Sequence, residues 1–264
     1  MSKMNLSVGI RGLKNGTNVL DIKVPDKLRV RHKCGIKWVD GAFGGQGFVP
    51  STVIMLTGTP GAGKTTFILQ LADALTGAGH IALYNTGEES LYQVKMVCER
   101  LNLKNGFYVG QDEKTDDILA HAEELRKLNP KKQMFLLQDS LQTLDDGYYA
   151  NGHTNSNTQV RATEQLANWA KEKYGVYIFI GQVNKDGEFN GKMQIKHMID
   201  SHARLYFDDQ KKSETYGERL FEVTKNRFGV NGRTYIVGIG KNGLYEKGHF
   251  SITGEDLSDD AENA

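Results

Sequence analysis

The 264-residue chain is poor in cysteine, has no long apolar run and carries almost no net charge. Its two cysteines, Cys34 and Cys98, lie far apart, which excludes a disulfide framework and any zinc module built on CxxC pairs. Apolar runs such as 176–180 fall far short of the ~20 residues of a membrane span, so we expect no membrane partner and a cytoplasmic protein. Lys and Arg number 33 against 32 Asp and Glu, so any nucleic-acid surface must be local.

Charge is nevertheless uneven along the chain. Residues 1–33 contain eight basic and two acidic side chains among several turn residues, and we expect a basic N-terminal arm there. Residues 255–264 contain five acids and no base, so we expect 251–264 to form a flexible acidic tail. The segment between them, 34–250, is then the folded core.

Within the core, short apolar runs alternate with longer helical stretches, the pattern of parallel βαβ units. Strands are predicted at 53–57, 81–85, 134–138 and 176–181, amphipathic helices at 64–75 and 158–173, and further β-rich stretches at 219–224, 234–239 and 244–246. Two hairpin signals, Asn231-Gly232 and Asn242-Gly243, lie among the last three. We therefore predict an α/β fold: a mostly parallel, twisted sheet flanked by helices, with antiparallel additions near the C-terminus.

A complete phosphate-binding motif, GxxxxGK[ST], directly follows the first predicted strand and begins the first predicted helix. Its candidate nucleotide-binding residues are Gly58, Thr59, Pro60, Gly61, Ala62, Gly63, Lys64 and Thr65, followed by Thr66. Backbone N–H groups of such a loop and the start of the helix suit a polyphosphate. We expect Lys64 to reach the β- and γ-phosphates of ATP and the Thr65 hydroxyl to bind Mg²⁺.

Acidic residues follow two other predicted strands. Asp139 closes the third strand, where a P-loop protein needs a carboxylate for Mg²⁺, although an Asp after a strand also commonly caps a helix. Glu88 and Glu89 follow the second strand, where an acid can polarise water, although two acids also suit a helix start. The sequence predicts a Mg²⁺ site at Thr65 and Asp139 and a catalytic base at Glu88 or Glu89.

Other P-loop classes fit the sequence less well. A GTPase would carry NKxD, whereas 184–187 reads NKDG with Asp one position early, and no DxxG follows at Asp139. Small-molecule kinases usually add an Arg-rich lid, and the central part of this chain has few arginines. Motor-type and recombinase-type ATPases remain, with a nucleotide kinase as a third interpretation.

Five segments together resemble RecA-like P-loop ATPases, in particular the bacterial RadA (Sms) branch. The entry segment 34–50, the P-loop, GEES at 87–90, DSLQT at 139–143 and KNRFG at 225–229 follow one another in family order. KNRFG is the motif that marks RadA. The resemblance covers about residues 34–245, which corresponds to the ATPase core of RadA without its zinc finger and Lon-like domains.

The resemblance implies a homo-oligomeric ring, expected to be a hexamer, with ATP between subunits. Glu88 matches the family's catalytic glutamate, Glu89 is a second candidate because related clock-protein ATPases carry a glutamate pair, and Gln182 matches a residue that senses the γ-phosphate. Lys225 and Arg227 match a basic pair inserted into the neighbour's ATP site, where cations stabilise charge developing on the phosphates. Without the resemblance, they would be interpreted as solvated charges at a strand end.

In this family two loops that follow core strands line the channel of the ring and contact DNA. They would fall at 145–157 and 184–196. Candidate DNA-binding residues in them are Tyr148, Tyr149, Lys185, Phe189 and Lys192. Aromatic rings can stack on bases and lysines can follow a phosphate backbone, although solvated surface loops have a similar composition.

The sequence thus predicts an ATP-hydrolysing, ring-forming DNA motor that uses Mg²⁺ and acts on single-stranded DNA in recombination, repair or replication. We expect DNA to stimulate its ATPase. The alternative is a KaiC-like ATP-dependent switch or scaffold that acts on a protein partner and hydrolyses ATP slowly.

Overall fold

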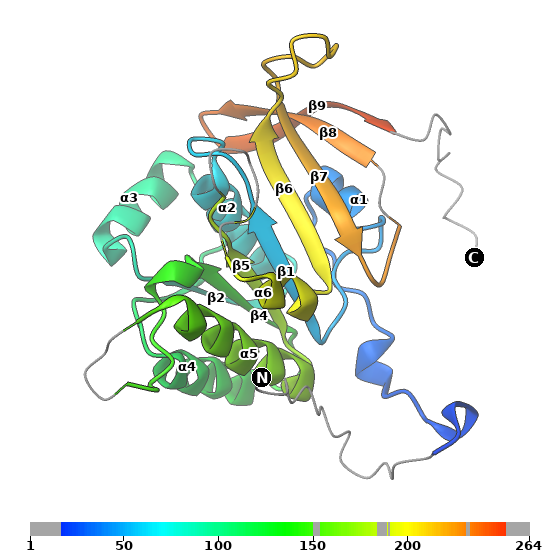
Figure 1. Ribbon diagram of the computed structural model, residues 1–264, viewed down its shortest axis with the longest axis vertical. Coiled ribbons are helices and arrows are strands. Elements are labelled where there is room, and N and C mark those ends of the chain that lie inside the picture. Colours follow the sequence, from blue (N-terminus) through cyan, green and yellow to red (C-terminus); the bar gives the residue numbers. More distant parts are fainter. Residues whose placement is uncertain (1–16, 150–153, 184–188, 190, 231–232, 252–264) are drawn as a thin grey trace.

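The computed structural model describes residues 17–149, 154–183, 189, 191–230 and 233–251, which form one nine-stranded sheet with helices on both faces (Figure 1). The predicted α/β architecture is confirmed. Lys185, the Asn231-Gly232 signal and the tail from 252 onward lie outside the described residues. Among the described helices, none is long and apolar enough to cross a membrane.

The sheet is parallel through its first six strands and antiparallel thereafter. The strands are β1 (Thr52–Thr57), β2 (Ile81–Thr86), β3 (Tyr108–Gly110), β4 (Met134–Asp139), β5 (Val176–Ile180), β6 (Ser201–Phe207), β7 (Arg219–Asn226), β8 (Arg233–Gly240) and β9 (Gly243–Ser251). Their order is β3-β2-β4-β5-β1-β6-β7-β8-β9, with β6 to β9 pairing antiparallel. The predicted antiparallel additions are confirmed, and Asn242-Gly243 lies at the β8–β9 turn.

Two strands have no counterpart in the sequence prediction, and β9 runs well beyond the predicted 244–246. Strand β3 has three residues and lies at an exposed sheet edge. Strand β6 alternates buried and half-exposed positions and begins with Ser201 and His202, so it contains no continuous apolar run. Strands β1, β2, β4 and β5 are buried at every position, which is why their apolar runs are visible in the sequence.

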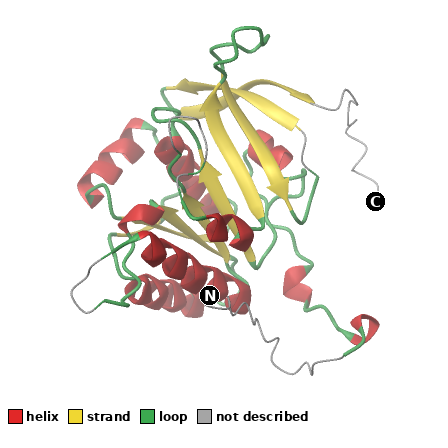
Figure 2. Cartoon of the chain, viewed as in Figure 1, coloured by secondary structure: helices red, strands yellow, loops and turns green. Residues whose placement is uncertain are grey.

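Helices cover both faces of the sheet (Figure 2). They are the short 3-10 turns η1 (Val19–Asp21), η2 (Asp26–Leu28) and η3 (Leu141–Thr143), and the helices α1 (Lys37–Ala42), α2 (Lys64–Gly77), α3 (Leu91–Arg100), α4 (Thr115–Leu128), α5 (Ser156–Lys173) and α6 (Met193–Met198). The helices predicted at 64–75 and 158–173 are α2 and α5. Helix α5 begins with a capping box at Asn155 and Thr158 and ends at left-handed Tyr174.

The two faces have separate apolar cores. One lies under α1 and α2, where an aromatic cluster of Trp38, Phe67 and Phe221 packs against the antiparallel half of the sheet. The other lies under α4, α5 and α6 around Trp169 and Tyr177. The carboxyl ends of the parallel strands all lie at the same end of the sheet between these layers. Ligands bind at this end in such folds.

The segment 17–31 extends away from this core (Figure 1). Neither η1 nor η2 contains a buried residue, and Val19 and Leu20 are 75% and 88% exposed. The segment joins the body at His32, which exchanges two backbone hydrogen bonds with Phe48. The boundaries of the basic arm and the core stay predictions.

The aromatic cluster yields a test of which residues hold the antiparallel strands on the core. Phe221 is fully buried, with its ring 5.2 Å from Trp38 and 5.1 Å from Phe67 between centroids. Phe221→Ala should lower the free energy of unfolding by about 3–5 kcal/mol because it leaves a cavity. Phe250→Ala is the control, since Phe250 is 38% exposed, and should change it by less than about 0.5 kcal/mol. Equal unfolding midpoints in urea for the two variants would contradict this account.

Candidate functional site

The phosphate-binding loop spans residues 58–65 between β1 and α2, as predicted. Gly61 and Gly63 have φ of +77° and +98°, in the left-handed region that favours glycine. A Cβ at Gly58 would lie 1.8 Å from the carbonyl oxygen of Leu205 on β6, so this position has no room for a side chain. The Thr59 hydroxyl oxygen is buried and has no hydrogen-bond partner among the described residues. The loop is therefore shaped by close backbone packing and retains a free polar atom.

The Lys64, Thr65 and Asp139 side chains meet at the carboxyl edge of the sheet. Lys64 Nζ donates to the carbonyl oxygens of Gly58 at 2.9 Å and Thr59 at 3.1 Å. The Thr65 hydroxyl donates to Asp139 Oδ2 at 2.8 Å, and the Tyr84 hydroxyl donates to the same oxygen at 3.2 Å. The structure thus brings the two predicted Mg²⁺ ligands into direct contact.

The electrostatics of this site favour an added cation. Burial raises the pKa of Asp139 to about 6, helped by the negative charges of Glu88 and Glu89 and opposed by the Thr65 and Tyr84 hydrogen bonds. Burial also lowers the pKa of Lys64 from its ordinary value, while Asp139 and Glu88 oppose this shift. Within the described residues no group of three or more His, Cys, Asp or Glu side chains could hold a metal. One carboxylate beside one hydroxyl nevertheless fits Mg²⁺, which takes phosphate oxygens and water as further ligands.

Glu88 and Glu89 differ in their contacts and in their effect on the pKa of Lys64. The Ser140 hydroxyl donates to Glu88 Oε1, and Gly87 N donates to the carbonyl of Asp139 at 3.1 Å, so the end of β4 holds the turn after β2. Glu88, and not Glu89, acts on the pKa of Lys64. Glu89 Oε2 is buried without a hydrogen-bond partner among the described residues. Which of the two is the catalytic base stays a prediction, with the contact to Ser140 and the effect on Lys64 belonging to Glu88.

Gln182 follows β5 and is exposed. Gly181 N donates to the carbonyl of Leu56 at 2.9 Å, which places Gln182 beside the end of β1. It therefore lies at the same sheet edge as the phosphate-binding loop. Its predicted role stays a prediction.

The predicted basic pair, Lys225 and Arg227, lies near the amino ends of the parallel strands, whereas the phosphate-binding loop follows the carboxyl end of β1. Lys225 Nζ donates to the Ile199 carbonyl at 2.6 Å, and Arg227 pairs with Asp200 at 3.0 Å while its side chain remains 57% exposed. Through β6, the end of β7 at Asn226 is level with Ile54 of β1, and β1 leaves the sheet at Thr57, about 10 Å further along. The structure therefore does not bring Arg227 to the loop of its own chain.

A half-buried histidine connects β1, which leads into the phosphate-binding loop, with β7, which leads to Arg227. His202 Nε2 lies 2.8 Å from the hydroxyl oxygen of Thr57, and Nδ1 lies 3.0 Å from that of Thr224. Because the Thr224 hydroxyl also donates to the carbonyl of His202 at 3.3 Å, its oxygen accepts from Nδ1–H and Nε2 accepts from Thr57. His202 is thus held neutral between β1 and β7.

The predicted DNA residues have different environments. Tyr148 is 68% exposed, with the Arg161 guanidinium 4.3 Å from its ring centroid, and the Tyr149 hydroxyl accepts from Asn155 at 3.2 Å. Phe189 is 8% exposed and packs in the second apolar core, so its ring is not open to a base in this arrangement. Lys192 Nζ donates to the side chain of Asn157. The DNA role of these residues stays a prediction.

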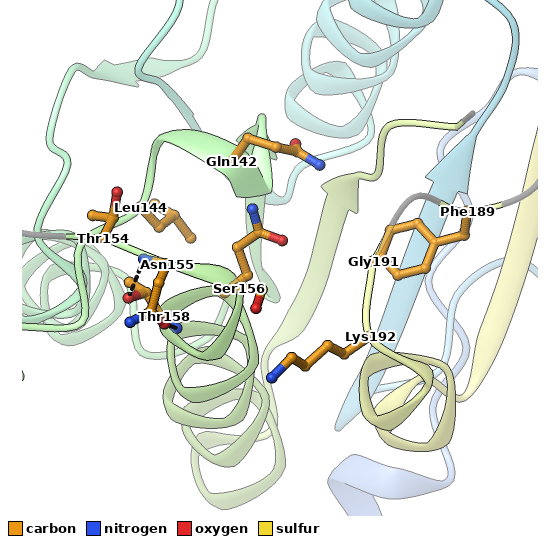
Figure 3. Close-up of a pocket in the computed structure, with 10 residues that line it drawn as sticks. Gln142, Leu144, Thr154, Asn155, Ser156, Thr158, Phe189, Gly191 and Lys192 are labelled. Carbon is orange, nitrogen blue, oxygen red and sulfur yellow. Dashed lines mark hydrogen bonds between the residues drawn. The ribbon is translucent and has the colours of Figure 1, made fainter. Parts of the chain in front are cut away.

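The two predicted DNA loops nevertheless flank one pocket. It has a volume of about 520 Å³ and is lined by Gln142, Leu144, Thr154, Asn155, Ser156, Thr158, Gln159, Phe189, Gly191 and Lys192. Figure 3 shows Lys192 extending from one side of this space toward the start of α5. A hollow with polar side chains, one lysine and the first turn of α5 has the chemistry to receive an anionic chain.

Comparison with known proteins agrees with the geometry. A protein-family model described as "ATPase: KaiC" matches residues 32–245. The chain belongs to the KaiC ATPase family. With its P-loop and sheet order, it is a RecA-like P-loop ATPase, as the sequence resemblance implied.

Curated relatives of this family member are DNA repair proteins named RadA. The protein from Brucella abortus is 30% identical over 214 residues, covering 80% of this chain and 44% of the relative. That from Bacillus subtilis is 31% identical over 242 residues, covering 91% and 50%. The chain spans about half the length of the curated relatives it matches.

Solved structures agree on the fold. A DnaB-like replicative helicase superposes with a TM-score of 0.66 at 18% identity, covering 80% of this chain and 60% of that one. A KaiC-like protein from Pyrococcus horikoshii, PH0186, has a TM-score of 0.63 at 19% identity, covering 83% and 99%. The likeness shows a shared RecA-like core.

Sequence reasoning did not single out Tyr84, Ser140 as a partner of Glu88, or His202. Tyr84 lies within an apolar strand, so its hydroxyl contact with Asp139 has no signal in the pattern. Ser140 follows Asp139 directly and is found only through the matched DSLQT stretch. His202 lies on a strand that the apolar pattern did not predict.

His202 yields a pH test. Burial, together with the charges of Arg204, Lys196 and Lys225, lowers its pKa from 6.5 to about 4. Between pH 6.5 and 4 the unfolded chain therefore binds a proton at His202 and the folded chain does not. The free energy of unfolding falls by up to about 3 kcal/mol as the pH decreases from 6.5 toward 4. His202→Gln should lose less stability across this window in urea unfolding.

The matched control for this test is His249→Gln, because His249 is exposed on β9, where it pairs with Glu246 and its ring lies 5.3 Å from that of Tyr235. Its stability should follow the wild type from pH 6.5 to 4. A His202→Gln curve parallel to the wild type would contradict the assignment.

Proposed function

We propose that this protein is an ATP-hydrolysing, ring-forming motor that acts on single-stranded DNA in recombination, repair or replication. The observation that carries the proposal is the convergence of Lys64, the Thr65–Asp139 pair and Glu88 at one sheet edge, with Arg227 exposed at the other. DNA as the substrate is supported by relatives named as DNA repair proteins and by the fold shared with a DnaB-like replicative helicase.

Each group has a task in this proposal. The loop N–H groups and Lys64 bind the phosphates, and Lys64 Nζ exchanges its carbonyl partners for phosphate oxygens. Thr65 and Asp139 would hold Mg²⁺, which would supply positive charge to the phosphates. Glu88, oriented by Ser140, accepts the proton of the attacking water. Gln182, which follows β5, senses the γ-phosphate in this proposal.

Lys225 and Arg227 act on the ATP of a neighbouring subunit in this proposal. Their position at the amino ends of the parallel strands leaves their own phosphate loop out of reach. A cation supplied by the neighbour makes hydrolysis depend on assembly, because charge on the phosphates is stabilised only in the ring.

A KaiC-like switch acting on a protein is the second candidate, favoured by the family model that matches the chain. The two functions differ in what controls the ATPase. A DNA motor couples hydrolysis to a strand at the pocket beside Lys192, whereas a switch hydrolyses slowly and ignores DNA.

The first test is the steady-state ATPase rate with and without single-stranded DNA, at low and moderate salt. We expect a salt-sensitive stimulation by DNA, because lysine–phosphate contacts release counterions. Lys192→Glu should weaken it, whereas Lys212→Glu, on the exposed loop after β6, should retain it. Lys64→Ala should reduce turnover roughly a hundredfold or more without changing the circular dichroism spectrum. A slow rate indifferent to DNA would favour the switch.

The second test asks whether Arg227 acts in trans. Arg227→Ala and Glu88→Ala subunits are each expected to be inactive alone. Mixed together, they should recover part of the ATPase, because some interfaces then contain an intact Glu88 facing an intact Arg227. Mixing Glu88→Ala with Lys64→Ala is the matched control and should recover nothing, since both changes affect the same side of the interface. No recovery at any ratio of the first pair would argue against trans action.

A further inference from the structure

Tyr84 is fully buried in β2 and has no task in the phosphate-binding motif or in the proposed function. Its hydroxyl nevertheless donates to Asp139 Oδ2 at 3.2 Å. The Thr65 hydroxyl donates to the same oxygen at 2.8 Å. Both hydrogen bonds end on Oδ2, so they fix the orientation of the carboxylate and neither of them occupies Oδ1.

The pairing of β2 with β4 explains how a tyrosine reaches this carboxylate. In the parallel register Tyr84 is opposite Leu137, and both belong to the apolar core that contains α2. Asp139 lies two residues beyond Leu137 and therefore on the same face of the sheet. Tyr84 and Asp139 are diagonal neighbours, with about 8 Å between their Cα atoms from the strand spacing and the two-residue offset. A long aromatic side chain with a terminal hydroxyl spans this separation, whereas a serine or threonine is too short.

The surroundings of the Tyr84 hydroxyl direct its single proton toward Asp139. Burial raises the pKa of Tyr84, helped by the charge of Asp139 and opposed by a hydrogen bond from the Thr86 side chain. A phenol oxygen that accepts from Thr86 keeps its own O–H for Asp139. The Thr86 oxygen in turn accepts from the backbone N–H groups of Glu88 and Glu89, both at 3.3 Å. The phenol is thus held between the turn after β2 and the carboxylate at the end of β4.

We propose that Tyr84 is a positioning residue for the Mg²⁺ site, whose hydroxyl holds Oδ2 of Asp139 and leaves Oδ1 to the cation or to a water bound to it. Thr65 can keep its own contact at the same time, because a hydroxyl that donates one hydrogen bond still has lone pairs for a metal. Partners of this kind orient metal ligands and tune metal affinity. The proposal rests on the proposed function, because it takes Thr65 and Asp139 as the Mg²⁺ ligands.

The test is Tyr84→Phe, which removes the hydroxyl and keeps the ring in the core. Titration calorimetry on the full chain measures the affinity for a non-hydrolysable ATP analogue, first in EDTA and then over a range of Mg²⁺ concentrations. In EDTA the variant should bind the analogue as the wild type does. The gain in affinity that Mg²⁺ provides should be about tenfold smaller, because losing the partner of a metal ligand typically weakens metal binding by this factor or more.

Tyr177→Phe is the matched control. Tyr177 is fully buried on the neighbouring part of the sheet, in β5, and its hydroxyl oxygen has no hydrogen-bond partner among the described residues. It belongs to the other apolar core, around Trp169. The same substitution there removes a buried phenol hydroxyl without touching Asp139, so the Mg²⁺ gain should equal that of the wild type. Asp139→Asn is the reference for a lost ligand and should abolish most of the gain.

The Mg²⁺ dependence of the ATPase gives a second readout, which a merely structural role would not move. Tyr84→Phe should need about tenfold more Mg²⁺ for its half-maximal rate, and its rate at saturating Mg²⁺ should approach that of the wild type. A hydroxyl that only stabilises the fold would instead lower the maximal rate and the affinity in EDTA together.

The outcomes separate this role from the proposed function. A wild-type Mg²⁺ gain in Tyr84→Phe, alongside its loss in Asp139→Asn, would overturn the positioning role and leave the Mg²⁺ site in place. An equal loss of affinity with and without Mg²⁺ in Tyr84→Phe would also overturn it, in favour of a structural role. Retention of the gain by Asp139→Asn, or no gain in the wild type, would contradict the Mg²⁺ site itself and the positioning role with it.

Discussion

The hydrogen bond from Thr65 to Asp139 is the contact on which the arrangement of the site depends. It joins the first turn of α2 to the end of β4 and so fixes the phosphate-binding loop against the strand two places along the sheet. From Asp139 the same edge extends to Tyr84 and, through Ser140, to Glu88. Parallel strands make this possible, because they deliver the ends of β1, β2, β4 and β5 to one edge.

The same arrangement of strands keeps Lys225 and Arg227 away from the phosphate-binding loop of their own chain. Strand β7 runs opposite to the parallel strands, so it ends at their amino ends, and Arg227 is anchored there on Asp200, which also accepts from Val53 N at 3.0 Å. A phosphate bound at residues 58–65 and a guanidinium at Arg227 thus belong to different faces of the molecule. In the proposed function, assembly of copies combines them.

The sequence allowed prediction of those parts of the site that are local. The loop at 58–65, Asp139 and Glu88 each follow an apolar strand, and the motif and its spacing place them without knowledge of the fold. The contacts of His202 and Tyr84 arise only when strands pair, and 145 residues separate Thr57 from His202 in the chain. Phe189 was expected at a DNA surface from its basic neighbours, whereas packing against Gly181 and Gly191 buries it.

The charges at the site explain why it needs cations from outside the chain. Two carboxylates, Asp139 and Glu88, act on a single Lys64, and burial together with the charges of Glu88 and Glu89 raises the pKa of Asp139. Triphosphate adds further negative charge to the same place. Lys64 alone cannot balance this charge in a buried setting, where unpaired charge is costly. In the proposed function, Mg²⁺ at Thr65 and Asp139 and an arginine from a neighbouring copy would supply the two missing cations.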